Sequence, residues 1–510
     1  MVARVHSGAL SGIDGYPVEV EVNLASGLPG MSIVGLPDTA VRESSERVSA
    51  AIKNTKLDLP LRKITVNLAP ANIKKEGSAF DLPIALGILA ANGLIKRESL
   101  SQYLILGELS LDGRVRPIKG ALSIAAMTKK EGLSGLLVPV ENAAEASVVN
   151  ELNVFPVETL PQAMEFLNGT ASIEPRKINL EEQFFNETRY EIDFTDVKGQ
   201  QHVKRALEIA AAGGHNILLI GPPGSGKSML AKRIPTILPS ISLGEAIETT
   251  QVHSILGHVN NGNGLLATRP FRSPHHTISD AGLIGGGRNP QPGEISLAHN
   301  GVLFLDEMPE FKRNVLEVLR QPLEEGMVSI SRASGSLTYP AKIMLVGALN
   351  PCPCGFKSHH RKECHCTPMQ IKKYLSKISG PLLDRIDIHI EVPSIEYKEL
   401  ASDSVGEASS QIRGRVEDAR KIQGERLKIS KVYCNATMTT RQLKTHCHLE
   451  EAAQKIMALA MEKLTLSARA HDRILKVSRT IADLEGEENI RSEHVAEAIQ
   501  YRSLDLEHWT

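Results

Sequence analysis

The first 168 residues alternate short apolar runs with longer helical stretches. Residues 18–22 and 64–68 place an apolar residue at every second position, as half-buried strands do, and residues 81–92 and 121–130 are the clearest helical stretches. This mixture of the two patterns predicts an α/β or α+β domain over residues 1–168.

Apolar periodicity fades between residues 169 and 197, where polar residues dominate, and we expect an interdomain linker there. A second block, residues 198–395, contains short and wholly apolar runs bounded by turn signals. Such runs are typical of the buried parallel strands of a three-layer α/β core. The runs lie at residues 216–220, 302–305 and 343–347.

The rest of the chain, residues 396–510, is mostly helical in pattern. We expect a helical lid domain appended to the core, with a polar stretch at residues 401–410 before its first helix. The predicted helices cover residues 411–426, 439–446, 449–464, 467–484 and 492–500.

Length and charge narrow the class of protein. A chain of 510 residues exceeds a single core and predicts about three domains. The net charge of −1 provides no global attraction to nucleic acid, so DNA binding would require local basic patches. The N-terminus lacks a signal-peptide pattern, and the longest apolar stretch, residues 83–95, is too short to span a bilayer. We therefore expect a cytoplasmic protein without a membrane partner.

A glycine-rich loop, GPPGSGKS, follows the apolar run at residues 216–220. Between a buried strand and a helix, such a loop offers backbone N–H groups to phosphate oxygens, a lysine to the β- and γ-phosphates and a hydroxyl to Mg²⁺. We expect ATP and Mg²⁺ as ligands, with Ser228 at the metal. The predicted nucleotide-binding residues are Gly221, Pro222, Pro223, Gly224, Ser225, Gly226, Lys227 and Ser228.

Two adjacent carboxylates end the apolar run at residues 302–305, about 80 residues after the loop lysine. At the carboxyl end of a parallel strand, Asp306 could hold Mg²⁺ directly or through water, and Glu307 could polarise the water that attacks the γ-phosphate. An apolar run followed by Asp-Glu is also a common strand end when it stands alone. The upstream loop favours the catalytic interpretation.

The next apolar run ends in Asn350, whose amide could orient the attacking water if the two strands are neighbours. Asn before proline is also a turn signal, and the residue could serve both purposes.

Four of the six cysteines fall within fifteen residues, as two CxC pairs separated by nine residues. Four thiolates form a tetrahedral set of soft ligands that suits structural zinc. Reduced free thiols and redox chemistry remain alternatives, and His359, His360 or His365 could replace one cysteine. The predicted zinc ligands are Cys352, Cys354, Cys364 and Cys366.

Basic residues gather around these cysteines. Residues 355–380 contain six lysines and arginines but a single acidic residue, Glu363. They could contact nucleic-acid phosphates or form a solvated surface. The six are Lys357, Arg361, Lys362, Lys372, Lys373 and Lys377, and the same two interpretations apply to Arg269, Arg272, Arg288 and Arg332.

Longer sequence motifs occur in addition to the loop and the two carboxylates, and the resemblance they carry covers essentially the whole chain. They are RPFRSPHHTISDAGLIGGGRNPQPGEISLAHNGVLFLDE at 269–307, NPCPCG at 350–355, ISGPLLDRIDIHIEVP at 378–393 and LSARAHDRILKVSRTIADL at 466–484. Together with the loop and the lid they resemble the AAA+ ATPases of the magnesium-chelatase-like branch, and within it the ComM/YifB family.

That resemblance implies a hexameric, DNA-dependent ATPase: a helicase that promotes branch migration during integration of DNA by homologous recombination in natural transformation. Its partners would be single-stranded or branched DNA and further copies of the chain. By the resemblance, Arg385 is the arginine finger and Arg469 the sensor arginine of the lid. Arg385 could instead pair with Asp384 or Asp387, and Arg473, one helical turn after Arg469, could take the sensor role.

The N-terminal segments IKKEGSAFDLPIAL and GELSLDGRVRPIKGAL resemble the Lon-type protease domain, which has a ribosomal-protein-S5-like fold. Ala79 stands at the position of that family's catalytic serine, with Ser78 displaced by one residue, and Leu122 stands at the position of its lysine. A serine–lysine dyad needs both groups in contact. We therefore expect a non-catalytic scaffold and no protease activity.

Three functions of different classes follow from the sequence: a DNA motor, a metal-insertion motor of the magnesium-chelatase kind, and a protein-remodelling ATPase. The chain has no DxSxS metal-binding motif, so a metal-insertion motor would need a separate partner. The cysteines and the basic patch favour the DNA motor.

Overall fold

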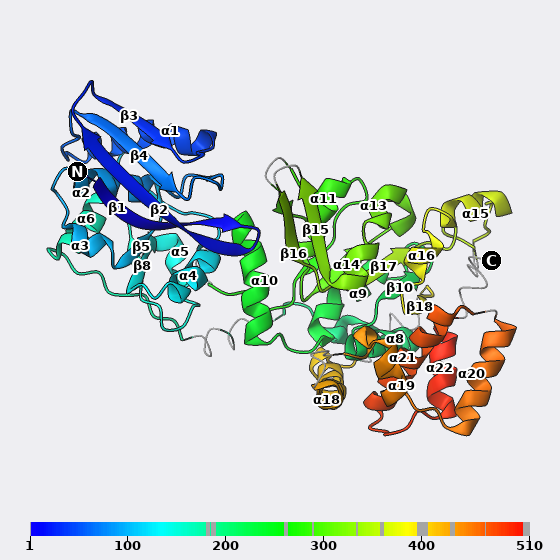
Figure 1. The fold of residues 1–510 in the computed structure, drawn as a ribbon. Coiled ribbons are helices and arrows are strands. Elements are labelled where there is room, and N and C mark those ends of the chain that lie inside the picture. Colours follow the sequence, from blue (N-terminus) through cyan, green and yellow to red (C-terminus); the bar gives the residue numbers. More distant parts are fainter. Residues whose placement is uncertain are drawn as a thin grey trace. The chain divides into compact units, whose positions relative to one another are not determined.

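The computed structural model describes residues 2–179, 184, 190–259, 264–287, 290–332, 335–357, 362–394, 406–428, 434–464 and 466–502. The chain forms two compact units (Figure 1). Unit 1 comprises Met1–Thr188 and Leu243–Ala267, and unit 2 comprises Arg189–Ser242 and Thr268–Thr510. Most of the polar centre of the predicted linker lies outside the described residues, as do residues 401–405.

Unit 1 is built on a seven-stranded mixed sheet with the order β3-β4-β2-β1-β5-β8-β9. β1 pairs antiparallel with β2 over its whole length, and β5, β8 and β9 continue the sheet in parallel. The predicted strands at 18–22 and 64–68 lie within β2 and β4. The strands are β1 (Val2–Ser11), β2 (Asp14–Ala25), β3 (Gly30–Val34), β4 (Lys63–Ala69), β5 (Tyr103–Ile105), β8 (Gly135–Pro139) and β9 (Val154–Val157), with a ribbon of β6 (Glu108–Leu109) and β7 (Val115–Arg116).

Helices pack on this sheet. Every residue of α2 is buried, and it lies against β1 and β2, which explains why its sequence has no polar face. The predicted helices at 81–92 and 121–130 are confirmed as α2 and α4. The helices are α1 (Thr39–Asn54), α2 (Asp81–Ala91), α3 (Arg97–Leu100), α4 (Ala121–Lys130), α5 (Val140–Ala146) and α6 (Leu160–Asn168).

A segment from later in the chain completes unit 1. α10 (Leu243–Leu256) packs against α4. The buried carboxylate of Glu145 joins the two helices, because it accepts hydrogen bonds from the Ser254 hydroxyl and, at 2.8 Å, from the Leu122 N–H. The sequence pattern includes this segment in the block 198–395, since local periodicity does not specify the sheet against which a helix packs.

Unit 2 contains a five-stranded sheet of order β11-β14-β17-β10-β18, in which every pair is parallel. Its three central strands are wholly buried and confirm the predicted runs at 216–220, 302–305 and 343–347. The strands are β10 (Ile217–Ile220), β11 (Phe271–Arg272), β14 (Val302–Leu305), β17 (Met344–Leu349) and β18 (Ile388–Glu391). Parallel strands present their carboxyl ends at one edge, where the predicted site residues follow.

Helices and short strands surround this sheet. Those before residue 394 are η1 (Phe194–Asp196), α8 (Gln201–Gly213), α9 (Lys227–Ile237), α11 (Asp280–Ile284), α12 (Glu294–Leu297), η2 (Met308–Glu310), α13 (Arg313–Glu317), α14 (Arg320–Glu325), α15 (Pro368–Leu375) and α16 (Gly380–Leu383). Two antiparallel pairs are also present: β12 (Gly285–Gly286) with β13 (Gln291–Pro292), and a hairpin of β15 (Met327–Arg332) with β16 (Gly335–Pro340).

The C-terminal segments form helices at the predicted places. α18 and α21 share one hydrophobic core with β10, β17 and α8, through residues such as Val416 and Ile481. The elements are α18 (Ser409–Leu427), η4 (Asn435–Thr437), α19 (Thr440–His446), α20 (Glu451–Lys463), α21 (Ala468–Leu484) and α22 (Ser492–Gln500). Among the described residues, no helix combines the length and apolar character needed to cross a bilayer.

Candidate nucleotide site and four-cysteine cluster

The loop GPPGSGKS connects β10 to α9, and its glycines are needed for its path. A Cβ on Gly221 would lie 2.2 Å from the Val392 carbonyl oxygen, and Gly224 and Gly226 adopt φ values of +78° and +90°. Only glycine adopts such angles at little cost. α9 begins at Lys227, so the loop leads to a helix N-terminus, whose unpaired N–H groups favour anions.

Lys227 lies inside this loop. Its Nζ donates hydrogen bonds to the carbonyl oxygens of Gly221 at 2.7 Å and Pro222 at 2.9 Å, and to Asn350 Oδ1 at 3.2 Å. Burial lowers the pKa of Lys227 to about 8, although Asp306 and Glu307 act in the opposite direction. The lysine thus joins the loop to the carboxyl end of β17.

Asp306 follows β14 and lies beside the loop that contains Lys227 and Ser228. The Ser228 hydroxyl donates a 2.6 Å hydrogen bond to Asp306 Oδ2, while the other carboxylate oxygen accepts the Glu307 N–H at 2.9 Å. A hydroxyl beside a carboxylate is the oxygen donor set that Mg²⁺ takes in nucleotide sites. Ser228 and Asp306 therefore fit a shared magnesium ion.

Glu307 is exposed next to this pair. Its side chain is 58% exposed, and its backbone has a φ of +49°, a left-handed conformation that is unfavourable for glutamate. His276, which follows β11, places Nδ1 3.8 Å from Glu307 Oε2. Sequence reasoning did not identify His276 as a site residue. Its place near Glu307 follows from the pairing of β11 with β14, which the sequence does not reveal.

Arg385 lies after α16 and is nearly buried, with its side chain 7% exposed. Its guanidinium donates to the Glu324 carboxylate of α14 and to the Pro381 carbonyl oxygen. The sequence left open an ion pair of Arg385 with Asp384 or Asp387, but the arginine pairs with Glu324 instead. Glu324 has no motif around it, and only the fold reveals it.

The two lid arginines differ in their surroundings. Arg469 is 67% exposed, and its nearest acid is Asp384 at 3.9 Å. Arg473 instead forms an ion pair with the buried Asp387. Arg469, Arg473, Asp384 and Arg385 line one cavity of about 140 Å³ together with Glu324, Asp472 and Lys476.

Asp387 is the centre of a buried polar network. Its Oδ2 lies 2.9 Å from His215 Nδ1, and His215 Nε2 lies 2.8 Å from the Thr480 hydroxyl of α21. Burial alone would raise the pKa of Asp387, but Arg473 and His215 hold it well below its usual range. Burial lowers the pKa of His215, which favours the neutral imidazole.

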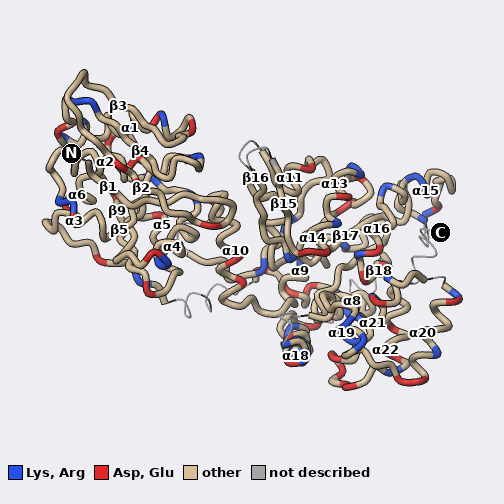
Figure 2. Tube along the Cα trace, viewed as in Figure 1, with Lys and Arg blue, Asp and Glu red and all other residues tan. Residues whose placement is uncertain are grey.

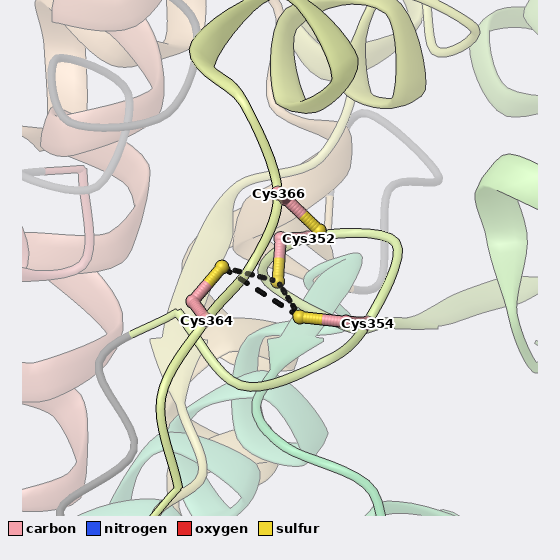
Figure 3. Close-up of side chains that lie close together, drawn as sticks. All are labelled: Cys352, Cys354, Cys364 and Cys366. Atoms are coloured by element: carbon pink, nitrogen blue, oxygen red, sulfur yellow. Dashed lines mark hydrogen bonds between the residues drawn. The ribbon is translucent and has the colours of Figure 1, made fainter.

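The four predicted zinc ligands converge, and Figure 3 shows their sulfur atoms facing one another from two stretches of chain. Sγ of Cys352 lies 3.4 Å from Cys354 and 3.6 Å from Cys364, and Cys354 lies 3.6 Å from Cys364. In a tetrahedral site with Zn–S bonds of about 2.3 Å, sulfurs are about 3.8 Å apart. The cluster fits a zinc ion.

The thiols of the cluster differ: burial raises the pKa of Cys352 to about 12, whereas hydrogen bonds favour the thiolate of Cys354. Burial opposes ionisation of Cys354, but the Phe356 N–H and the neighbouring thiols lower its pKa to about 6. The Lys357 N–H donates to Cys352 Sγ at 3.3 Å. His359 and His360 lie outside the described residues, and His365 is exposed.

The basic patch follows the cysteines onto α15, where Figure 2 shows basic positions in blue. Lys362, Lys372 and Lys373 are exposed, and the Lys362 ammonium lies 4.8 Å from the ring centroid of Phe356. Lys377 pairs with Glu310 at 3.4 Å. Arg361 and Arg288 lie outside the described residues, as does the side chain of Arg332.

Two other basic candidates are engaged within the protein. Arg269 donates to the carbonyl oxygens of Pro239 at 2.6 Å and Asn300 at 2.7 Å, and Arg272 makes two 2.7 Å hydrogen bonds to Glu294. These bonds favour a structural role over phosphate contact.

In unit 1, the protease-like positions do not bring a hydroxyl to an amine. The half-buried Ala79 packs against an apolar cluster, and Leu122 is fully buried. The Ser78 hydroxyl donates to the Glu108 carboxylate, and Lys75 Nζ donates to the Ile73 carbonyl oxygen at 2.8 Å.

Comparisons with known proteins match nearly the whole chain. Three family models match: "Magnesium chelatase, subunit ChlI" at residues 193–400, "Subunit ChlI of Mg-chelatase" at 20–142 and "Magnesium chelatase, subunit ChlI C-terminal" at 406–502.

Several curated relatives are similar over nearly their full length. Competence protein ComM of Haemophilus influenzae is 44% identical over 99% of this chain and 98% of its own. The uncharacterized protein YifB of Escherichia coli is 42% identical over 98% of this chain and 97% of its own. The magnesium-chelatase 38 kDa subunit of Cereibacter sphaeroides is 23% identical over 59% of this chain and 88% of its own. The chain therefore belongs to the ComM/YifB family of magnesium-chelatase-like AAA+ proteins.

Proposed function

We propose that this chain is an ATP hydrolase that works as a hexameric DNA motor: a helicase that promotes branch migration when DNA is integrated by homologous recombination in natural transformation. The convergence of Lys227, Ser228, Asp306 and Asn350 at one sheet edge carries the ATPase part of the proposal. The similarity to a competence protein supports the process. The proposal places the chain in the cytoplasm.

Each residue of the site has a task. The loop N–H groups and Lys227 hold the phosphates, and Ser228 and Asp306 would hold Mg²⁺, which offsets phosphate charge when bound. Glu307 accepts the proton of the attacking water, and Asn350 orients that water. The exposure of Glu307 leaves room for the water next to Asp306.

Arginines complete the site from a neighbouring copy. In this proposal, Arg385 is the arginine finger and Arg469 the sensor arginine of the lid. An arginine supplied to the γ-phosphate is worth about 10³- to 10⁵-fold in rate, so ring assembly would control hydrolysis. The exposure of Arg469 supports it over Arg473, which is committed to Asp387.

The other parts support the motor. We propose the division into a non-catalytic Lon-protease-like domain (1–168), linker (169–197), ATPase core (198–395) and lid (396–510). The four cysteines hold structural zinc, and the exposed lysines of α15 contact DNA phosphates. Phosphate contacts would give binding that weakens with salt.

The test is the ATPase rate with and without single-stranded or branched DNA, at 50 and 200 mM salt. We expect stimulation by DNA, and binding that falls steeply with salt. No stimulation together with salt-independent binding would refute the DNA motor. Turnover that responds instead to a protein carrying a DxSxS motif and a porphyrin substrate would support the alternative, a metal-insertion motor, which the chelatase-subunit relative suggests. Stimulation by an unfolded protein would support a protein-remodelling ATPase.

A further inference from the structure

The four-cysteine cluster lies directly against the nucleotide loop. A Cβ built on Gly355, the residue after Cys354, would lie 2.5 Å from Cδ and 2.7 Å from Cγ of Pro223. Gly355 also has a φ of +81°. The loop that holds two of the sulfurs therefore packs against the phosphate-binding loop, with no space for a side chain between them.

A second connection passes through Asn350. Its side-chain oxygen accepts a 3.2 Å hydrogen bond from the Lys227 ammonium. In the sequence, only Pro351 separates Asn350 from the buried Cys352. Tyr374 of α15, the helix that follows Cys366, lies next to the backbone of Asn350. The chain before the first cysteine and the helix after the last one thus meet at Asn350, the residue that joins β17 to the nucleotide loop.

A tetrahedral metal would fix these contacts. It holds four sulfurs at set distances and directions, whereas the thiols of Cys352, Cys354 and Cys364, 3.4–3.6 Å apart, make only weak hydrogen bonds. Without the ion, Cys352 and Gly355 are free to move apart from Cys364. Any such movement is transmitted to Asn350 through one proline and to Pro223 through direct contact.

We propose that the metal ion held by the four cysteines positions Asn350 and the nucleotide loop, so that occupancy of the cysteine site sets the affinity for nucleotide. The inference rests on the proposed ATP and zinc sites and adds a coupling between them. When Gly355 moves, Pro223 moves with it, and so do the loop N–H groups that would bind the phosphates; the nucleotide then loses at least one hydrogen bond to a charged phosphate oxygen.

The first experiment removes the metal from the side of the cluster farther along the chain from Asn350. A double variant, Cys364→Ser with Cys366→Ser, leaves residues 350–355 unchanged. We expect elemental analysis to show loss of zinc, and the Kd for a fluorescent ADP analogue to rise about tenfold or more, the equivalent of one such hydrogen bond. Stripping wild-type protein with a chelator should have the same effect, and adding Zn²⁺ back should restore the affinity.

The second experiment keeps the cysteines and disturbs the contact. Gly355→Ala places a methyl group against Pro223, and we expect it to weaken ADP binding while zinc remains bound. Gly486→Ala is the matched control, because Gly486 has a similar φ of +72° but no atom within 4 Å of a built Cβ. The control should bind both ligands like the wild type.

Two outcomes would overturn the inference: zinc-free wild-type protein that binds ADP with unchanged affinity, or Gly355→Ala that binds ADP like Gly486→Ala. Circular dichroism identifies a variant that has unfolded, in which case reversible zinc removal from the wild type decides. Failure of the proposed function has a different signature. Zinc-dependent ADP binding without DNA stimulation would refute the DNA motor and leave the coupling in place.

Discussion

Arg385 forms an ion pair with Glu324 of its own subunit. The arginine is 7% exposed and the glutamate 54% exposed, so the pair lies at the surface end of a nearly buried guanidinium. An arginine finger must exchange this carboxylate for a phosphate of the neighbouring subunit. In the proposed role of Arg385 as the arginine finger, Glu324 therefore competes with the nucleotide for it.

Neutralising Glu324 should release the finger. We expect Glu324→Gln to raise the ATPase kcat of assembled rings several-fold, and Arg385→Ala to lower it about 10³-fold. Steady-state ATPase assays at matched oligomeric state measure both. Glu325→Gln is the control, since the Glu325 carboxylate accepts a hydrogen bond from Gln321 in its own helix. A lower kcat in Glu324→Gln would mean that the glutamate orients the arginine instead.

Removing the proposed base should separate binding from hydrolysis. Glu307→Gln keeps the Ser228–Asp306 pair, so the Kd for ATP should change less than about twofold, whereas kcat should fall at least about 10²-fold. Isothermal titration and phosphate release measure the two. Glu310→Gln, a nearby exposed acid that pairs with Lys377, should keep its activity. Equal losses in both variants would contradict a specific role for Glu307.

Charge reversal on α15 should weaken DNA binding. Lys372→Glu with Lys373→Glu removes two exposed cations, so the affinity for single-stranded DNA should fall. The negative slope of log K against log salt should become shallower by about 1.4, the contribution of two phosphate contacts. Fluorescence anisotropy across salt concentrations measures the slope. Lys421→Glu, an exposed lysine in α18, should leave it unchanged. An unchanged slope in the α15 variant would remove this helix from the DNA interface.

Acid should destabilise unit 2 through His215 and Asp387. Both groups have a pKa lower in the folded chain than in the unfolded one. The unfolded chain therefore binds more protons as pH falls, so their contribution to stability is present above the unfolded pKa and lost below it. For histidine that loss begins near pH 6.5, at up to about 1.4 kcal/mol per pH unit.

Urea unfolding at pH 5, 6 and 7 measures this dependence. His215→Asn should remove up to about 1.4 kcal/mol per pH unit of the slope. The control His471→Asn alters a partly exposed histidine of α21 and should keep the wild-type slope. The same pH dependence in both variants would assign it to other groups.

Contiguous features of the chain were predictable. The sequence GPPGSGKS indicates a phosphate loop because its backbone donors come from consecutive residues, and wholly apolar runs such as 302–305 indicate buried parallel strands. The cysteine cluster was predictable for a related reason, since both CxC pairs lie within fifteen residues and metal ligation needs only that they meet.

Pairings between distant residues required the tertiary structure. The order β14-β17-β10 places Asp306 and Asn350 beside the loop, although sequence order places β10 far before both. Glu324 carries no motif, and Arg269 and Arg272 look like DNA ligands until their internal partners are known.

The sequence alone therefore determined the chemical groups, the nucleotide loop and most of the elements, because these depend on neighbouring residues along the chain. Only the fold decided that α10 completes unit 1 and that Gly355 packs on Pro223. Such contacts depend on how helices and strands pack, and packing joins residues whose separation along the chain carries no local signal.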